Sequence, residues 1–189
     1  AWFDGRTPRQ VCRFPQASVK SPAKMKTLYI LRHAKSSWDD HSLTDHERPL
    51  NERGLRTAPF IGGLMKERGL VPDAIVSSPA VRAKQTAELV REAAGFEPEI
   101  AFNERIYEAS ISTLIAVITE LDNEADRVLL VGHNPGAAGL LYYLTGEVAP
   151  LPTAALAIIE LEIGSWAEID GGRGTLKQVI RPKDEMLAK

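Results

Sequence analysis

The chain has 189 residues, of which 44% are hydrophobic and 25% charged, so it is long and apolar enough to bury one ordinary core. Its formal net charge of -2 gives no general electrostatic reason to bind nucleic acid or an anionic membrane. The single cysteine, Cys12, excludes an intramolecular disulfide framework, and no apolar run approaches the ~18 residues that a membrane helix needs. We therefore expect one cytoplasmic domain without a nucleic-acid or membrane partner.

Residues 1–24 differ from the rest of the sequence in charge and proline content. They contain five basic residues, three prolines and one acidic residue, Asp4. They lack the apolar core of a secretory signal, and their prolines disfavour an amphipathic transit helix. Because Met25 directly precedes the first expected strand, we predict that residues 1–24 form a flexible basic extension and residues 25–189 the domain.

Expected strands and helices alternate through most of the chain. Residues 27–31 form an apolar run that is typical of a strand buried between two helical layers. Asn51 and Ser110 are placed to cap helices at their N-termini, and Gly95 is placed to end one. The expected strands are 27–31, 73–77, 100–107 (weaker) and 127–131, and the expected helices are 51–69, 79–95 (opened by Pro79), 110–121 and one beyond Gly136.

The C-terminal part departs from this alternation. Residues 155–162 and 175–180 are rich in strand-forming residues and are separated by a turn signal at 170–172. Alternating strands and helices favour a parallel sheet with right-handed crossovers, whereas this pair favours an antiparallel addition. The predicted fold class is α/β, a three-layer sandwich with a mainly parallel central sheet, helices on both faces and an antiparallel C-terminal edge.

Two histidines occupy matching places. His33 and His133 each follow directly after an expected apolar strand. Ligands of open α/β sheets bind outside the carboxyl ends of the strands, so both imidazoles are expected at the same edge. His41 and His46 lie in the polar segment after the first strand, and we expect them to have no role in catalysis.

Cationic side chains gather at the same strand ends. Arg32 precedes His33, Lys35 follows it, and Arg82 lies in the first turn of the helix after the second strand. A cation there opposes the helix dipole, and a bound anion would reverse this penalty and could also use free N–H groups of the first turn. Because guanidinium groups match phosphoryl oxygens in bidentate fashion, the pattern predicts a phosphoryl site.

These residues belong to three ordered motifs: LRHAKS at 31–36, SSPAVRAKQTA at 77–87 and VGHNP at 131–135. The ordered set resembles the histidine phosphatase superfamily, whose fold is phosphoglycerate mutase-like, over nearly all of residues 27–144. The Arg-His-Ala-Lys-Ser form, with Arg48-Pro49-Leu50 and Gly54, is similar to the SixA-type phosphohistidine phosphatase branch in particular.

The resemblance implies roles for the matching residues. His33 would be the nucleophile, Arg32 and Arg82 would hold the phosphoryl oxygens, and His133 would complete the pocket as a donor. Arg48 matches a further arginine that lines the pocket in the SixA-type branch. Neighbouring cations would lower the pKa of His33 and favour its neutral, nucleophilic form.

Other residues near these histidines and arginines are also expected to take part in the site. Lys35 and Asn134 are expected to contact phosphate or substrate, and the charge of Lys35 would add to the effect on His33. Glu108 matches a glutamate in the family's Tyr-Glu-Ala stretch and is the candidate general acid, with Asp45 as the competing carboxylate. A partner role for Glu108 at the following helix N-terminus is equally compatible with the sequence.

The expected function is a phosphatase that uses neither metal nor cofactor and removes phosphate from phosphohistidine on a protein. It would act through a covalent phosphohistidine intermediate. The alternative is a broad phosphomonoesterase acting on small phosphorylated metabolites. A phosphoglycerate mutase-like activity is less expected, because the region after His33 is short. A noncatalytic phosphate-binding protein is also less expected, because the chain retains His33, Arg32, Arg82 and His133.

Overall fold

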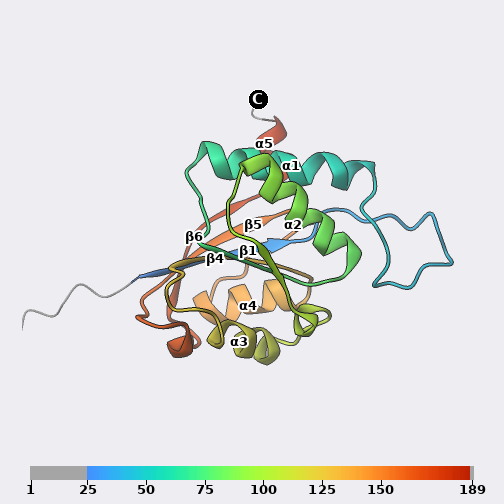
Figure 1. The fold of residues 1–189 in the computed structure, drawn as a ribbon. Helices are drawn as coiled ribbons and strands as arrows, with labels where there is room; N and C mark the ends of the chain where they lie inside the picture. Colours follow the sequence, from blue (N-terminus) through green and yellow to red (C-terminus); the bar gives the residue numbers. More distant parts are fainter. Residues whose placement is uncertain (1–24, 188–189) are drawn as a thin grey trace, which may run out of the picture.

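The computed structural model describes residues 25–187. A six-stranded sheet, in the order β3-β2-β4-β1-β5-β6, lies between two layers of helices (Figure 1). This arrangement confirms the predicted three-layer α/β fold. The predicted extension at 1–24 lies outside the described residues and stays a prediction. Within the described part of the chain, no helix is long and apolar enough to cross a membrane.

The elements follow one another in the expected alternation. The strands are β1 (Lys26–Arg32), β2 (Ala74–Ser77), β3 (Ile100–Phe102), β4 (Arg127–Gly132), β5 (Leu156–Leu161) and β6 (Gly174–Ile180). The α-helices are α1 (Glu52–Glu67), α2 (Val81–Ala94), α3 (Ile111–Thr119), α4 (Gly136–Thr145) and α5 (Pro182–Leu187). Two short 3₁₀ turns, η1 (Glu104–Ile106) and η2 (Trp166–Glu168), complete the set.

The sheet combines a parallel part with an antiparallel edge, as predicted. Strands β3, β2, β4 and β1 are paired in parallel. Strand β5 pairs antiparallel with β1, and β6 pairs antiparallel with β5. Strand β1 therefore lies inside the sheet, with a parallel neighbour on one side and an antiparallel neighbour on the other.

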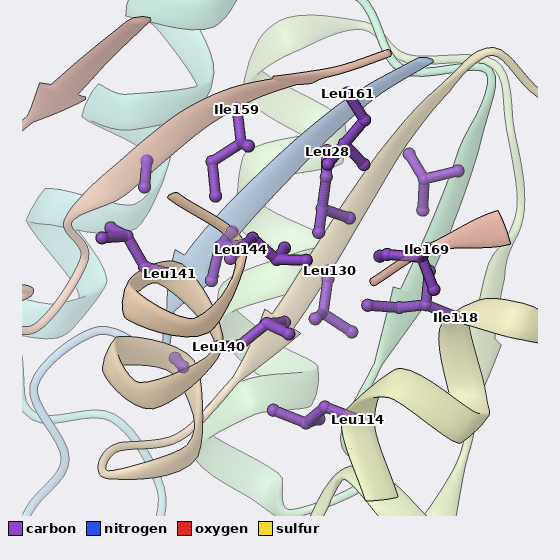
Figure 2. Close-up of a cluster of buried hydrophobic side chains, with 14 of the residues drawn as sticks. Leu28, Leu114, Ile118, Leu130, Leu140, Leu141, Leu144, Ile159, Leu161 and Ile169 are labelled. Atoms are coloured by element: carbon purple, nitrogen blue, oxygen red, sulfur yellow. The ribbon is translucent and has the colours of Figure 1, made fainter. Parts of the chain in front are cut away.

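Strand β1 contributes to a core on each face of the sheet. Leu28 and Ile30 pack toward α3 and α4, whereas Tyr29 and Leu31 pack toward α1 and α2. All four side chains are buried, as expected for a strand between two helical layers. Figure 2 shows the first of these cores, in which side chains of α3 and α4 meet Leu28 of β1 and Leu130 of β4.

Local side-chain chemistry sets the predicted helix ends. The Asn51 side chain accepts a hydrogen bond from the backbone N–H of Gly54 at 3.0 Å, and Ser110 accepts one from Thr113 at 3.1 Å. Each bond satisfies one of the first-turn donors that a helix leaves without an internal partner. Gly95 ends α2 in the left-handed conformation, with φ of 70°.

One predicted strand is much shorter than expected. Residues 100–107 were expected to form a strand, but β3 ends at Phe102 and η1 follows. The Asn103 side chain accepts a hydrogen bond from the Arg105 backbone N–H at 3.0 Å, which offers the chain a local alternative to the strand ladder. As a result, Tyr107 and Glu108 lie in a loop beyond the sheet.

The N-terminus of α1 packs tightly against the segment that follows β1. The Lys35 carbonyl oxygen accepts a hydrogen bond from the Asn51 backbone N–H at 3.0 Å. A β-carbon on Gly54 would lie 2.2 Å from the same oxygen, which is closer than any tolerated contact. Glycine at position 54 is therefore required for this close approach of two backbones.

We predict that Gly54→Ala lowers the free energy of unfolding by about 1–3 kcal/mol, because the added methyl group must displace backbone. The matched control is Gly63→Ala in the same helix, where a β-carbon would meet nothing within 4 Å. That change should raise stability by about 0.5–1 kcal/mol, because it removes backbone freedom from the unfolded chain. Urea denaturation checks both values, and equal effects of the two substitutions would contradict the packing argument.

Candidate active site

The two histidines predicted to meet do so because β1 and β4 end in register. Arg32 of β1 pairs with Gly132 of β4, so His33 and His133 are the next residues on adjacent strands. The His33 backbone N–H donates to the Gly132 carbonyl oxygen at 3.0 Å, which extends the ladder by one residue. The two imidazole rings lie with their centroids 5.0 Å apart.

Strand β2 ends at the same edge of the sheet and places the residues of the second motif there. Its last residue, Ser77, pairs with Val131 of β4, and the Ser78 backbone N–H donates to the Val131 carbonyl oxygen at 3.0 Å. The Ser78 hydroxyl lies 2.8 Å from Nε2 of His133. The motif after β2 therefore orients the second histidine and begins the helix that carries Arg82.

A backbone hydrogen bond orients the His33 ring. Nδ1 lies 2.7 Å from the carbonyl oxygen of Ala34. Because a carbonyl oxygen accepts, Nδ1 carries the proton and Nε2 keeps its lone pair. Ala34 is itself fixed, since its backbone N–H donates to Oγ1 of Thr86 at 3.0 Å. Thr86 thus connects the second motif to the first.

The surroundings of His33 favour its neutral form. Burial is the largest cause, and it lowers the pKa of His33 to about 4. The charges of Arg82, Arg32 and Arg48 add to this effect, whereas the hydrogen bond to Ala34 opposes it. The neighbouring cations, which we expected to cause the lowering of this pKa, contribute less than desolvation. The imidazole is therefore neutral, and available as a nucleophile, at neutral pH.

His133 is neutral for similar reasons. Burial is again the largest cause and, with the nearby His33 and Arg82, lowers the pKa of His133 to about 3. The ring of Tyr107 contacts it edge-on, with centroids 5.6 Å apart. Nδ1 is buried and has no hydrogen-bond partner among residues 25–187. If Ser78 donates to Nε2, the proton is on Nδ1, and this buried N–H is then left without an acceptor among the described residues.

Asp45 joins two buried arginines. Its carboxylate lies 2.7 Å from Arg48 and 2.7 Å from Arg82, and it accepts a hydrogen bond from the Tyr107 hydroxyl at 2.9 Å. Arg82 also donates to the Asp45 backbone carbonyl. Partial burial alone would raise the pKa of Asp45, but the hydrogen bonds from Tyr107, Arg82 and Arg48 outweigh it and hold that pKa well below its usual range. Asp45 is therefore ionised and keeps both guanidinium groups in place.

The segment between β1 and α1 is fixed by further contacts of Arg48. This guanidinium donates to Ser36 Oγ at 2.7 Å and to the Ser37 carbonyl oxygen at 2.9 Å. The Leu50 backbone N–H donates to Oε1 of Gln85 in α2 at 2.8 Å. Ser36 of the first motif and Gln85 of the second therefore help to hold this segment in place beside α2.

A cavity of about 250 Å³ opens beside these groups. It is lined by Arg32, His33, Lys35, Ser36, Trp38, Arg48, Arg82 and Thr153. The structure thus brings together five of the sequence-predicted site residues around one space, with His133 in ring contact with one of them.

Two predicted site residues lie apart from this cavity. Asn134 donates to the Leu151 carbonyl oxygen at 3.0 Å, the same oxygen that accepts from Arg32 at 2.9 Å, and it lines an adjoining pocket on the other side of Arg32. Glu108 is exposed, has a positive φ of 48° and does not line the cavity. Their predicted roles therefore stay predictions.

We expected free backbone N–H groups at the start of α2 to help bind an anion. For two of them this prediction is wrong. Val81 donates its N–H to the His46 carbonyl oxygen at 3.0 Å, and Ala80 donates to Ser78 Oγ at 3.3 Å. These donors are already used by the protein. An anion at this edge would be held by side chains rather than by these two backbone groups.

Three residues of the cavity wall were not among the predicted site residues: Ser36, which lies within the first motif, Trp38 and Thr153. Trp38 follows the first motif by two residues, and its aromatic character beside a polar segment was the available signal. Thr153 comes from the loop between α4 and β5, which carries no recognisable motif. Across residues 25–187, no three His, Cys, Asp or Glu side chains are grouped in a way that would hold a metal ion.

Known proteins resemble this chain both in sequence and in fold. The model of the histidine phosphatase superfamily (branch 1) matches residues 28–114. An uncharacterized protein of Mycobacterium tuberculosis is 32% identical over 157 residues, which cover 77% of this chain and 96% of that protein. SixA of Agrobacterium tumefaciens, described as a candidate phosphohistidine phosphatase, has a TM-score of 0.72 at 30% identity, covering 83% and 98% of the two chains. The protein histidine phosphatase SixA complexed with tungstate shares the fold, with a TM-score of 0.73 at 23% identity over 84% and 99%.

We predict that His33 titrates far below an ordinary histidine. Its NMR titration midpoint should lie near pH 4, because burial and arginine charges both disfavour the imidazolium. Arg82→Gln should raise the midpoint by removing one of those charges, whereas Arg91→Gln, at the other end of α2, should leave it unchanged. A midpoint near 6.5 in the unmodified protein would contradict this account of the site.

Proposed function

The chain belongs to the histidine phosphatase superfamily, and from this premise we propose that it is a phosphatase that acts on phosphohistidine carried by a protein. The observation that carries the proposal is a buried, neutral His33 whose Nε2 keeps its lone pair beside Arg32, Arg82 and Arg48. A neutral nucleophile surrounded by cations suits the attack on a phosphoryl group, whose negative charge those cations stabilise.

In the first step, the lone pair of His33 Nε2 attacks phosphorus and forms a new P–N bond. The P–N bond of the substrate breaks, and its electron pair leaves with the substrate imidazole, which takes up a proton. Arg32 and Arg82 hold the phosphoryl oxygens during the transfer, and His133 donates to one of them. In the second step, water attacks phosphorus, and the P–N bond to His33 breaks with its electron pair returning to Nε2. Inorganic phosphate leaves with the oxygen of the water, the surplus proton passes to solvent, and neutral His33 is restored.

Two carboxyl groups are candidates to donate the proton that the leaving imidazole takes up, and their protonation differs. Asp45 is held ionised by its hydrogen bonds, so in the free protein it anchors arginines and has no proton to give. Glu108 is exposed at the loop after η1 and remains the proposed general acid. The demand on it is small, because a protonated imidazole is a good leaving group.

The size and border of the cavity favour a substrate whose phosphoryl group projects from the surface of a protein. A space of about 250 Å³ has room for a phosphoryl group and one ring, and the exposed side chains of Lys35 and Trp38 stand at its border. The likeness to SixA proteins supports the same class of substrate. Small phosphorylated metabolites remain the alternative substrates, and a panel of phosphate esters tests them directly.

We predict that the protein incubated with a phosphohistidine peptide accumulates acid-labile phosphate on His33. His33→Ala should abolish this label and lower the hydrolysis rate by about 10³-fold or more, because the covalent route is lost. The control is His41→Ala, since His41 lies in the exposed polar segment and does not line the cavity. Continued labelling of the His33→Ala protein would show that the nucleophile is wrong.

We also predict that chelation leaves the hydrolysis rate unchanged. In the proposed mechanism, arginines and His133 supply all of the charge stabilisation that a metal ion would otherwise give. The rate with the phosphohistidine peptide is measured after dialysis against EDTA, with and without added Mg²⁺ or Zn²⁺. A loss of activity that returns with added metal would contradict this part of the proposal.

A further inference from the structure

Trp38 has an unusual combination of exposure and position. The residue is 62% exposed, although it carries the largest apolar side chain in proteins, and it lines the same cavity as His33. A single exposed aromatic residue needs no explanation by itself. One that lines a cationic cavity together with His33 places a flat apolar surface beside the proposed phosphoryl site.

The ring is held in position without being buried. The Arg48 guanidinium lies over one face, 3.1 Å from the ring centroid. Arg48 is itself buried and fixed by Ser36, Ser37 and Asp45. Because Arg48 covers one face and the residue is 62% exposed, the other face of the indole is open to solvent.

Resting on the proposed function, we propose that this face of Trp38 is the leaving-group subsite, and that it binds a planar heteroaromatic ring bonded directly to phosphorus, the imidazole of phosphohistidine. With the phosphoryl group held by Arg32 and Arg82, the leaving ring extends one bond from phosphorus toward the border of the cavity. Offset stacking on the indole would hold it there. The ring becomes cationic when protonated, and an indole face attracts a cation, so the contact strengthens as the leaving group is activated.

Tyr142 provides a comparison within the same chain. It is 55% exposed, lies in the second half of α4 and does not line the cavity. Its ring is similar in size and exposure but is not placed beside His33. Truncation of Tyr142 therefore controls for the general effect of removing an exposed aromatic side chain.

The subsite is tested by binding rather than turnover, with two stable phosphonates that differ in the ring. The affinities of phenylphosphonate and methylphosphonate are measured by calorimetry for the unmodified protein and for Trp38→Ala, Trp38→Phe and Tyr142→Ala. We expect the preference for the phenyl compound to fall by about three- to tenfold in Trp38→Ala, the size of one aromatic stack. Trp38→Phe should keep most of the preference, and Tyr142→Ala all of it.

The ratio of the two affinities separates stacking from damage to the phosphate site. Loss of the contact with Trp38 could disturb Arg48, but that would weaken both phosphonates equally and leave the ratio unchanged. A fall of the ratio by less than threefold in Trp38→Ala overturns the subsite, whatever happens to the individual affinities. A fall of the same size in Tyr142→Ala also overturns it.

Turnover distinguishes failure of the subsite from failure of the proposed function. Phosphohistidine peptide is compared with phosphoramidate, which has a P–N bond but no ring. If the unmodified protein hydrolyses neither compound, the proposed function is wrong. The ratio of the two phosphonate affinities then still tests whether Trp38 forms the subsite. If the unmodified protein hydrolyses both, Trp38→Ala should lower kcat/KM for the peptide by at least threefold more than for phosphoramidate, and equal losses would overturn the subsite.

Discussion

The pairing of β1 with β4 is the constraint on which the site depends. The ladder pairs Arg32 with Gly132, so the residues that follow are adjacent histidines with ring centroids 5.0 Å apart. Because side chains alternate between the faces of a sheet, a slip of one residue would separate the imidazoles and turn buried core residues toward the wrong helical layer. The packing of both cores against β1 thus fixes the relative position of His33 and His133.

Charge balance is the second condition of the site. Arg48 and Arg82 are both buried, and burying a cation without a partner is costly. The Asp45 carboxylate satisfies both guanidinium groups from a partly exposed position, so they stay ordered without substrate. Burial keeps His33 neutral, and the same cations add to this effect because they disfavour a further positive charge. The arrangement that would bind a phosphoryl dianion therefore also favours the neutral form of His33, the proposed nucleophile.

Local signals in the sequence were sufficient for the fold class and for the helix ends at Asn51, Ser110 and Gly95, since caps and apolar runs act over a few residues. They failed for residues 100–107, where the hydrogen bond from Arg105 to the Asn103 side chain prevailed over strand propensity. Four of the predicted residues at the cavity, Arg32, His33, Lys35 and Arg82, lie in motifs at the end of β1 or the start of α2, and only Arg48 comes from the irregular segment between β1 and α1. The part played by the loop between α4 and β5 could not be predicted, since its contact with Arg32 joins positions far apart in the sequence.

A crystal structure with vanadate, a stable analogue of the phosphoryl group in transfer, tests the central claim most directly. We expect vanadium bonded to Nε2 of His33, with its oxygens contacted by Arg32, Arg82 and His133. Vanadate bonded to another residue, or held away from His33 by a different set of side chains, would contradict it.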